Sequence, residues 1–371
     1  MSGHSRSIKL GIIGCGWVPE LLHVPALKQV GMTDIVAVAD DHEDRLKRVA
    51  DRFRVPRRCS DYRTLLDDPA IEAVGVWLPG DRQVEAVQAV LAAGKHLFID
   101  KPLVFDLKVW DRLIEQAAQA NKKIMIVGLP RRWHRHVRHA REVIRQGVLG
   151  DIALIRTILT GKNPERRTIQ EEGTRHAVKG ILYQFGVHHF DTLQALVQRD
   201  VQEICATSSA DGLTVVVTAR LSDGIMVSST FAESENKNDE IEVVGQTGQL
   251  KISCYRFDGF EHVPSGSHPG DVQARARQVI RTIKELPQGL WRMRRGGDFI
   301  DSTRVGWQHC LDAIQRDTRP ACTLEEGRRV LQVILAAKES LEIGRPVTLR
   351  PRSQTVEPQV TAESLGRGGM G

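Results

Sequence analysis

The chain has 371 residues, of which 41% are hydrophobic and 26% are charged, proportions typical of a globular protein. At roughly 100–200 residues per domain, this length predicts two or three domains. No stretch approaches the ~18 consecutive apolar residues of a transmembrane helix. The N-terminus lacks a signal-peptide layout and the six cysteines form no Cys-x-x-Cys pair, so we expect a cytoplasmic protein with reduced thiols.

The formal net charge is +6, from 52 basic and 46 acidic residues. Because both signs are mixed along most of the chain and only 5% of the residues are aromatic, we expect no nucleic-acid binding. A group of histidines around His136 and His139 does not predict a metal site, since Arg135, Arg138 and Arg141 crowd the same turns and would repel a cation. We therefore expect no bound metal.

The first 128 residues alternate short apolar runs with helical patterns, which predicts an α/β domain with a doubly wound parallel sheet. Apolar residues at three- and four-residue spacing mark the helices. The expected strands are Ile8–Ile13, Ile35–Ala39, Ala73–Leu78, His96–Ile99 and Ile124–Val127, and the expected helices are Glu43–Phe53, Gln83–Ala93 and Leu107–Ala120.

Residues 129–350 contain β-rich segments joined by short turns, which predicts an α+β domain with an open, mostly antiparallel sheet. Thr323, with Glu326 three residues on, forms a capping-box pattern for the last helix. Residues 351–371 are rich in Ser, Gly, Pro and Arg, so we expect a disordered tail. The expected strands are one starting at Ile152, Thr214–Leu221, Ile225–Phe231, Ile241–Val244 and Leu250–Cys254, and the expected helices are Trp133–Gln146, Leu182–Val197 and Leu324–Ile343.

One further segment, Val272–Leu286 and its continuation to Arg295, is amphipathic and basic. Such a helix can lie on an anionic membrane or dock on a partner helix. We favour a helix that packs on the C-terminal sheet or across a dimer interface.

Two glycines, Gly14 and Gly16, follow the first expected strand and precede Trp17. A dinucleotide site needs glycines here, because one permits a tight turn and the next lets the backbone approach the pyrophosphate. The amides of the following helix N-terminus then face the phosphates. A simple strand-to-helix turn is the alternative.

Asp40 ends the second expected strand, where a carboxylate can accept hydrogen bonds from the ribose and repel a 2′-phosphate. This favours NAD over NADP, although His42 and Arg45 nearby keep NADP open.

Several ordered motifs follow one another along residues 7–350. They are Gly14-Cys15-Gly16, Asp100-Lys101-Pro102 after Ala93-Gly94-Lys95-His96, Gly147-Val148-Leu149-Gly150, Gly186-Val187-His188 and Gly344-Arg345-Pro346-Val347. In these motifs the chain resembles the Gfo/Idh/MocA family. The resemblance implies a Rossmann domain, a second domain with an open sheet, and a sugar or cyclitol oxidoreductase that uses NAD or NADP. It also implies cofactor contacts from Gly14, Gly16, Trp17, Asp40, Pro79, Lys101 and Pro102.

By this resemblance, Lys101 is the active-site lysine near the nicotinamide and the substrate hydroxyl. Its expected place at the carboxyl edge of a parallel sheet is where ligands bind, and a cation there favours alkoxide character in a reacting hydroxyl. Arg132 matches an arginine of the family that would contact the substrate or the nicotinamide. The family's histidine in the loop after the fourth strand is absent here, and Gln83 stands in that loop.

In helical geometry Gln184, His188 and Asp191 share one stripe, whereas His189 belongs to the apolar side. We expect His188 and Gln184 to be catalytic and Asp191 to bind substrate. The family commonly has an aspartate where Gln184 stands. An amide can orient a histidine but cannot carry protons, so the proton relay of the family's dehydrogenases is in doubt.

The predicted function is therefore an NAD(P)-dependent oxidoreductase acting on a sugar, sugar derivative or cyclitol. One alternative is an enzyme that keeps the hydride on its cofactor between steps, as in redox-assisted epimerisation or elimination. Another is a nucleotide-binding sensor or partner subunit without catalysis. Because the open sheet needs its second face covered, we expect a homodimer or homotetramer.

Overall fold

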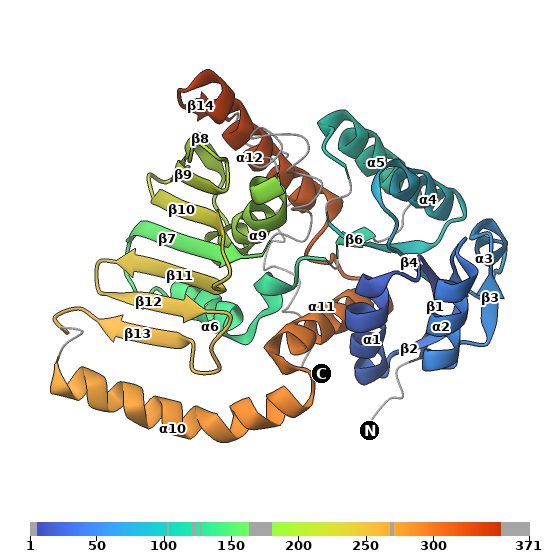
Figure 1. The fold of residues 1–371 in the computed structure, drawn as a ribbon, viewed down its shortest axis with the longest axis horizontal. Coiled ribbons are helices and arrows are strands. Elements are labelled where there is room, and N and C mark those ends of the chain that lie inside the picture. The colour runs from blue at the N-terminus through green and yellow to red at the C-terminus, as the bar shows by residue number, and fades with distance from the viewer. Residues whose placement is uncertain are drawn as a thin grey trace, which may run out of the picture.

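The structure is a computed structural model that describes residues 6–101, 104–120, 124–126, 128–162, 180–267 and 271–349. Two sheets lie side by side and give the molecule its two halves (Figure 1). Pro102, Val127 and residues 351–371 lie outside the described residues.

The first sheet is fully parallel, in the order β3-β2-β1-β4-β5-β6, which confirms the doubly wound fold expected from the sequence. The edge strand β3 was not expected, because its three residues, Arg57–Cys59, contain no apolar run. The other strands are β1 (Ile8–Ile13), β2 (Thr33–Ala39), β4 (Ala73–Val76), β5 (His96–Ile99) and β6 (Ile124–Ile126).

Helices cover both faces of this sheet. One apolar core joins a face of the sheet to α1, α2 and α11, and a second joins the other face to α3, α4 and α5. Trp307 of α11 donates from Nε1 to Nδ1 of His23 at 3.1 Å, so a helix from the far end of the chain completes the first core. The helices are α1 (Val24–Val30, after the π-helical turn η1, Pro19–His23), α2 (Glu43–Phe53), α3 (Arg63–Leu66), α4 (Gly80–Ala92), α5 (Leu107–Ala120) and α11 (Gly297–Gln315).

The sequence did not predict α11. The predicted domain division after residue 128 stays a prediction, and the packing of α11 on α1 crosses it.

The second sheet has eight strands in the order β13-β12-β11-β7-β10-β9-β8-β14, and only the β7–β10 pair is parallel. The expectation of an open, mostly antiparallel sheet is confirmed, although β8, β13 and β14 were not expected. The strands are β7 (Ile152–Gly161), β8 (Val201–Ser208), β9 (Thr214–Leu221), β10 (Met226–Glu233), β11 (Asn238–Gly245), β12 (Gly248–Ser253), β13 (Phe260–Pro264) and β14 (Val347–Thr348).

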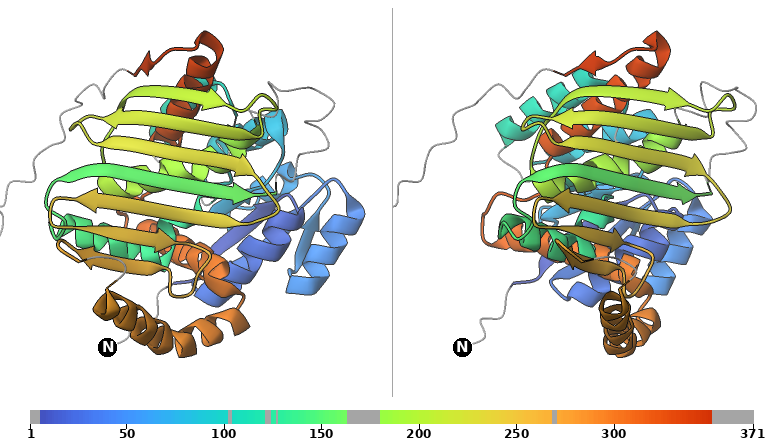
Figure 2. Two further views of the ribbon diagram at one scale, coloured as in Figure 1. Left: turned by 60° about the vertical axis from the view of Figure 1, so that its left-hand side comes forward. Right: turned by 90° about the vertical axis from the view of Figure 1, so that its left-hand side faces the viewer.

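Among the described helices, three cover the inner face of the second sheet, the face turned toward the first sheet. They are α6 (Arg135–Arg145), α9 (Val187–Val197) and α12 (Leu324–Ile343). Burial alternates along β9, as expected of a strand with one covered face. In the right-hand view of Figure 2 the outer face of this sheet is turned toward the viewer, and these three helices lie behind it.

The basic segment forms one 23-residue helix, α10 (Val272–Arg294), along the edge of the molecule (Figure 1). The helix contacts β13 and α6 through its polar side, and its apolar side is exposed in the single chain. The alternative that it packs across a dimer interface stays a prediction. None of the described helices is long and apolar enough to span a bilayer. Among the described residues no group of His, Cys, Asp and Glu could hold a metal ion.

Candidate active site

The phosphate loop leaves β1 at Gly14, which has a φ of +94°. A Cβ at Gly14 would overlap the backbone carbonyl oxygen of Trp77, so only glycine fits this turn. A Cβ at Gly16 would meet nothing within 4 Å, so the backbone there is open to a ligand. Trp17 follows with 69% of its surface exposed. The loop therefore has the shape that pyrophosphate binding requires.

Asp40 is buried at the end of β2 and braces this loop. Its carboxylate accepts from the backbone N–H groups of Cys15, at 2.7 Å, and His42, at 2.8 Å. Nε of Arg45 donates to the same carboxylate at 3.2 Å. These contacts hold Asp40 against the loop, beside the position predicted for the ribose.

A hollow of about 210 Å³ lies at this end of β2, lined by Asp40, Asp41 and Arg82 among others. Asp41 is half exposed and accepts from Arg82 at 2.7 Å. This hydrogen bond lowers the pKa of Asp41, so its carboxylate stays charged beside the hollow. Neither Asp41 nor Arg82 was predicted to line the cofactor site, although the adjacent acid in Asp40-Asp41 was a visible signal. Pro79 is exposed at the start of α4, on the carboxyl side of β4.

Lys101 lies two residues beyond β5, at the carboxyl edge of the parallel sheet. Its backbone N–H donates to Oδ1 of Asp100 at 2.7 Å. Gln83 is buried and donates from Nε2 to the carbonyl oxygen of Asp100 at 3.3 Å. A Cβ at Gly128 would overlap the Asp100 carboxylate. Gln83 and Gly128 thus fix the strand end that carries Lys101.

Gln184 comes from the second half of the molecule and meets Lys101, whose Nζ donates to Gln184 Oε1 at 3.4 Å. Gln184 lies in the π-helical turn η3 (Leu182–Gly186), which leads directly into α9. The wider turn was not expected, and π-helical turns occur often at functional sites. The carboxyl edge of the first sheet and the start of α9 therefore share one site.

His188, in the first turn of α9, is half-buried, and its Nδ1 has no hydrogen-bond partner among the described residues. Burial, and then the cations of Arg131 and Lys101, hold the pKa of His188 well below its usual value. The imidazole is therefore neutral near neutral pH and can accept a proton.

His189 is fully buried, as the sequence predicted, and its Nε2 lies 3.0 Å from Oδ1 of Asp239. Nε of Arg131 donates to Oδ2 of the same carboxylate at 2.5 Å. Burial alone would raise the pKa of Asp239, but Arg131 and His189 outweigh it and leave that pKa below its usual value. The negatively charged Asp239 carboxylate is thus buried against His189, the residue that follows His188 in the chain.

The sequence analysis missed both Arg131 and Asp239. Asp239 alternates with Ile241 and Val243 in β11, and that spacing indicates the covered face of the sheet. A charged residue at such a position was the available signal. In the pair Arg131-Arg132, Arg131 is the one whose charge acts on His188.

Arg132 and Asp191 form a buried ion pair rather than lining an opening. Nε of Arg132 donates to Oδ2 of Asp191 at 2.9 Å, and a second hydrogen bond joins Nη2 to Oδ1. Nη1 of Arg132 also donates to Glu326 at 2.6 Å. The Asp191 side chain is only 1% exposed. The pair ties η2 (Pro130–Trp133) to α9 and α12, so the predicted contact with substrate gains no support.

Taken together, the described residues fit a dinucleotide along the carboxyl edge of the first sheet. Gly16, Asp40 and Asp41 lie at one end of this edge, and Lys101 lies at the strand end beside the second half of the molecule. This is the edge at which doubly wound sheets bind ligands.

Known proteins agree with this arrangement. Residues 8–129 match the family model described as an oxidoreductase family with an NAD-binding Rossmann fold, and residues 137–251 match the GFO/IDH/MocA C-terminal domain. The chain is 25% identical over 359 residues to the uncharacterized oxidoreductase YrbE of Bacillus subtilis, covering 93% of this chain and 97% of that protein. It is 25% identical over 358 residues to the myo-inositol 2-dehydrogenase of Thermotoga maritima, covering 92% and 98%.

Among solved structures, a probable dehydrogenase from Thermotoga maritima has a TM-score of 0.73 at 23% identity, covering 92% of this chain and 99% of that one. The scyllo-inositol dehydrogenase from Lactobacillus casei with bound NAD(H) and scyllo-inositol has a TM-score of 0.71 at 19% identity, with the same coverage. These likenesses concern the fold. Because family models match both halves, the chain belongs to the Gfo/Idh/MocA family and is an NAD-dependent oxidoreductase.

Proposed function

We propose that this enzyme transfers a hydride between NAD and a carbon of a sugar, sugar derivative or cyclitol that carries a hydroxyl or keto group. The observation that carries the proposal is the meeting of Lys101 and Gln184, 3.4 Å apart, at the carboxyl edge of the first sheet, next to His188. The relative named myo-inositol 2-dehydrogenase supports a polyhydroxylated substrate.

In this proposal the dinucleotide is held by residues along that edge. The open backbone at Gly16, after the tight turn at Gly14, would face the pyrophosphate together with Trp17, and Asp40 and Asp41 would face the ribose. Pro79, Lys101 and Pro102 remain the predicted contacts of the nicotinamide end. The bound nicotinamide supplies a hydride acceptor in oxidation and a hydride donor in reduction.

Lys101 would hydrogen-bond the reacting oxygen of the substrate. A fixed cation beside that oxygen stabilises the negative charge that develops on it when its proton leaves. Gln83 supports this role indirectly, because it donates to the backbone carbonyl of Asp100 and so holds the strand end that carries Lys101.

His188 would exchange the proton of the substrate hydroxyl. Its lowered pKa keeps the imidazole neutral, as a group that accepts a proton during oxidation must be. Gln184 accepts from Lys101 through Oε1, which leaves its amide N–H groups to donate to the substrate or to His188.

Arg131 joins the proposed site, because its charge acts on His188 and it holds the Asp239 carboxylate beside His189. Arg132 and Asp191 are not part of the proposed substrate site, because they pair with each other in a buried ion pair.

The test is a panel of cyclitols, aldoses and sugar acids incubated with the purified enzyme and NAD, with NADH formation followed by absorbance. At least one compound should reduce NAD at a rate that Lys101→Ala lowers about 10²–10³-fold. The reverse panel pairs NADH with the corresponding ketones. An enzyme that binds NAD tightly but turns over no member of either panel would contradict the proposal.

A homodimer or homotetramer is the proposed assembly. The outer face of the second sheet supports it, because apolar side chains such as Val216 and Met226 are exposed there. Light scattering at micromolar concentration tests this, and a monomer would contradict it.

A further inference from the structure

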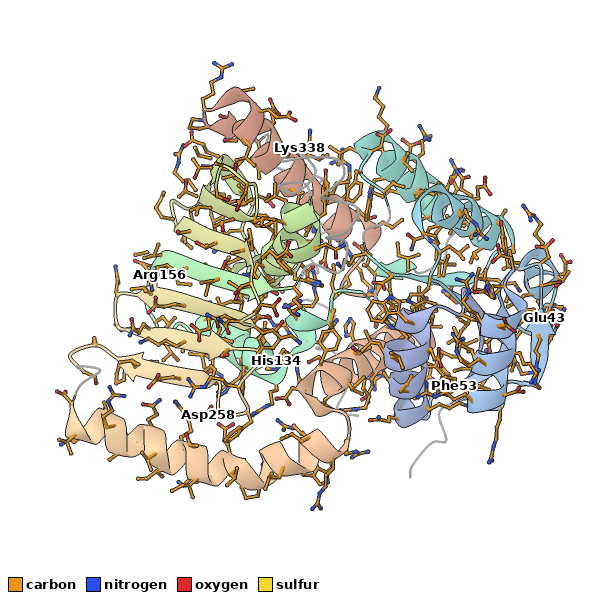
Figure 3. All side chains as sticks on the ribbon, in the orientation of Figure 1. Glu43, Phe53, His134, Arg156, Asp258 and Lys338 are labelled. Carbon is orange, nitrogen blue, oxygen red and sulfur yellow. The ribbon has the colours of Figure 1, made fainter. Side chains whose placement is uncertain are left out.

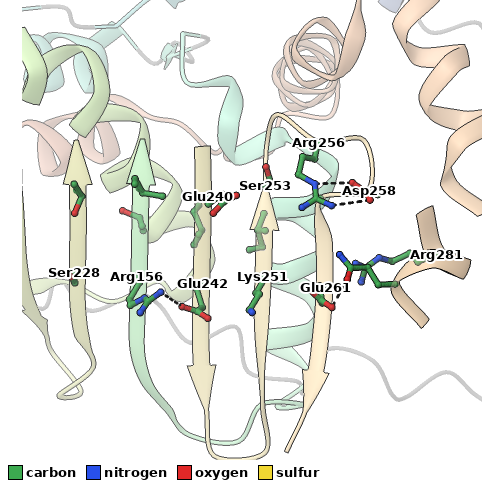
Figure 4. Close-up of a pocket in the computed structure, with 17 residues that line it drawn as sticks. Arg156, Ser228, Glu240, Glu242, Lys251, Ser253, Arg256, Asp258, Glu261 and Arg281 are labelled. Carbon is green, nitrogen blue, oxygen red and sulfur yellow. Dashed lines mark hydrogen bonds and ion pairs between the residues drawn. The ribbon is translucent and has the colours of Figure 1, made fainter. Parts of the chain in front are cut away.

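The inner side of α10 is polar and is held to β13, to the loop before it and to α6 by hydrogen bonds and ion pairs. Thr282 donates to Asp258 at 2.6 Å, and Glu285 accepts from Arg135 at 3.0 Å. Arg281 reaches Glu261 across a hollow of about 520 Å³ between the outer face of the sheet and the helix (Figure 4). Figure 3 shows Asp258 beside α10 and Arg156 on the sheet. The polar side of this amphipathic helix therefore faces the protein.

The opposite side of α10 carries an apolar stripe, the outer stripe, whose members recur at three-, four- and seven-residue steps. In an ordinary surface helix such a stripe faces the core. Here it is exposed, to 64% at Ile283 and 71% at Met293. The outer stripe consists of Val272, Val279, Ile283, Leu286, Leu290 and Met293, with Ile280 and Trp291 beside it.

The charge of this segment is as uneven as its hydrophobicity. Residues 272–295 contain seven basic residues and one acid, Glu285, so the segment has a net charge of +6, which equals the net charge of the whole chain. The rest of the chain is therefore electrically balanced. Five of the basic side chains are exposed beside the outer stripe: Arg275, Arg277, Lys284, Arg294 and Arg295.

We propose that α10 docks this protein on the surface of an anionic lipid bilayer. A helix with an apolar stripe of Ile, Leu and Trp and with flanking Lys and Arg inserts its stripe at the level of the headgroups, while the cations meet lipid phosphates. The helix lies at an edge of the molecule, where a flat surface can reach it (Figure 1).

Charge complementarity favours lipid over a second copy of the chain. An isologous contact through the outer stripe would bring the basic residues of both copies together, and like charges placed face to face oppose association. Nucleic acid would meet the cations but would leave the aliphatic side chains of the stripe exposed to water. Anionic lipid satisfies both features at once.

The experiment is flotation of the full-length protein with vesicles of phosphatidylcholine alone and of phosphatidylcholine mixed with phosphatidylglycerol. The wild-type protein should float with the anionic vesicles at low salt, at least tenfold more than with neutral ones, and salt should release it. Absence of this preference overturns the proposal.

Three variants locate the surface. Ile283→Glu with Leu290→Glu should abolish flotation, and Arg277→Gln with Lys284→Gln should weaken it severalfold while leaving the outer stripe intact. Ile343→Glu, at an exposed apolar residue at the end of α12, should float like the wild type. NAD binding verifies that each variant is folded.

Light scattering of the same variants distinguishes the two possible occupants of the outer stripe, anionic lipid and a second copy of the chain. If the outer-stripe variant changes the oligomeric mass and still floats like the wild type, a second copy covers the stripe and the membrane proposal is wrong. If the mass is unchanged and flotation is lost, the proposal holds. Neither result depends on the proposed catalytic function.

Discussion

The parallel sheet and the mixed sheet differ in how their faces are covered. Helices lie on both faces of the parallel sheet, and every residue of β4 is buried. In the mixed sheet one face is covered and the other is open, so burial alternates along β9 (Figure 2). The covered face carries Asp239 next to His189, whereas the open face carries ion pairs such as that between the exposed Arg156 and the half-buried Glu242.

This difference determines where a charged side chain can shift the pKa values of its neighbours. Where helices exclude water, a charge interacts strongly with its neighbours and shifts their pKa values, as Arg131 and Lys101 do at His188. On the open face, water screens the ion pairs. We therefore expect changes on the covered side to have large effects and matched changes on the open side to have small ones.

The largest effect is expected at the meeting point of the two halves. His188→Ala should lower kcat about 10²–10⁴-fold, because general acid–base groups contribute on this scale. Lys101→Ala should lower it about 10²–10³-fold by removing a cation from the developing alkoxide. The Kd for NAD should change little in both. Lys108→Ala, at an exposed lysine, is the control. Normal turnover in the two site variants would mean that the site is misassigned.

The next largest effect concerns stability. Asp191→Ala removes the buried partner of Arg132 and leaves it only the ion pair with Glu326, so it should lower the free energy of unfolding by about 3–5 kcal/mol, measured by denaturant titration. Glu242→Ala breaks the pair with Arg156 on the open face and should cost less than about 1 kcal/mol. Equal losses in the two variants would refute the contrast between the covered and open faces.

The third effect is a loss of stability in acid. Burial, and then the neighbouring His136, lowers the pKa of His134 to about 3, and burial and Arg135 lower that of His136 to about 4. As the pH falls, both histidines are therefore protonated in the unfolded chain before they are protonated in the folded one. Their contribution to the free energy of unfolding is fully present above the ordinary histidine pKa of 6.5 and is lost as the pH drops toward about 4. Each histidine contributes up to ~1.4 kcal/mol per pH unit.

Unfolding midpoints measured across this pH range provide the check. His134→Gln and His136→Gln should each make the decline shallower. A wild-type midpoint that is independent of pH would show that these histidines are not buried in their neutral form.

A smaller effect is expected from Gln184→Asp. A carboxylate four residues before His188 should raise the pKa of that imidazole by about one or more, and the acidic limb of the kcat profile should move to higher pH. If Gln184 instead binds the substrate directly, KM should rise and the profile should keep its position. A variant that leaves both KM and the profile unchanged would remove Gln184 from the site.

The smallest effect concerns cofactor choice. Asp41→Ala removes a negative charge next to the hollow and leaves Arg82 without the hydrogen bond to Asp41, so that Arg82 can meet a 2′-phosphate. The preference for NAD over NADP should narrow by about tenfold, which is the contribution of one hydrogen bond to a charged group. Asp40→Ala should narrow it as well, with an added loss of stability because Asp40 braces the phosphate loop. Isothermal titration with both cofactors measures this, and a widened preference would contradict it.

Short-range patterns determined much of this protein from the sequence alone. The apolar run of β1, followed by Gly14 and Gly16, sets a strand and a turn through neighbouring residues only, and both appear where they were expected. The place of Lys101 at the sheet edge was predictable because it lies two residues beyond an apolar strand, whereas its role was implied by the family resemblance. The β-rich segments joined by short turns likewise predicted the mixed sheet, because a short turn leads one strand back beside the previous one.

The tertiary structure decided what those patterns do not encode. Edge strand β3 has no apolar run, so no local pattern predicts it. Helix α11 packs on α1, and its Trp307 bonds to His23 across 284 residues of the chain, so no local pattern predicts this packing either. Arg131 and Arg132 are adjacent and chemically identical, and only their distant partners, Asp239 and Asp191, separate their roles.

The outer stripe of α10 makes the same point. Its periodicity predicted an amphipathic helix correctly, but the polar partners on β13 and α6 turned its apolar side away from the core. Periodicity specifies which residues share a face of an element. The direction of that face depends on contacts between residues far apart in the chain, and only the folded structure supplies them.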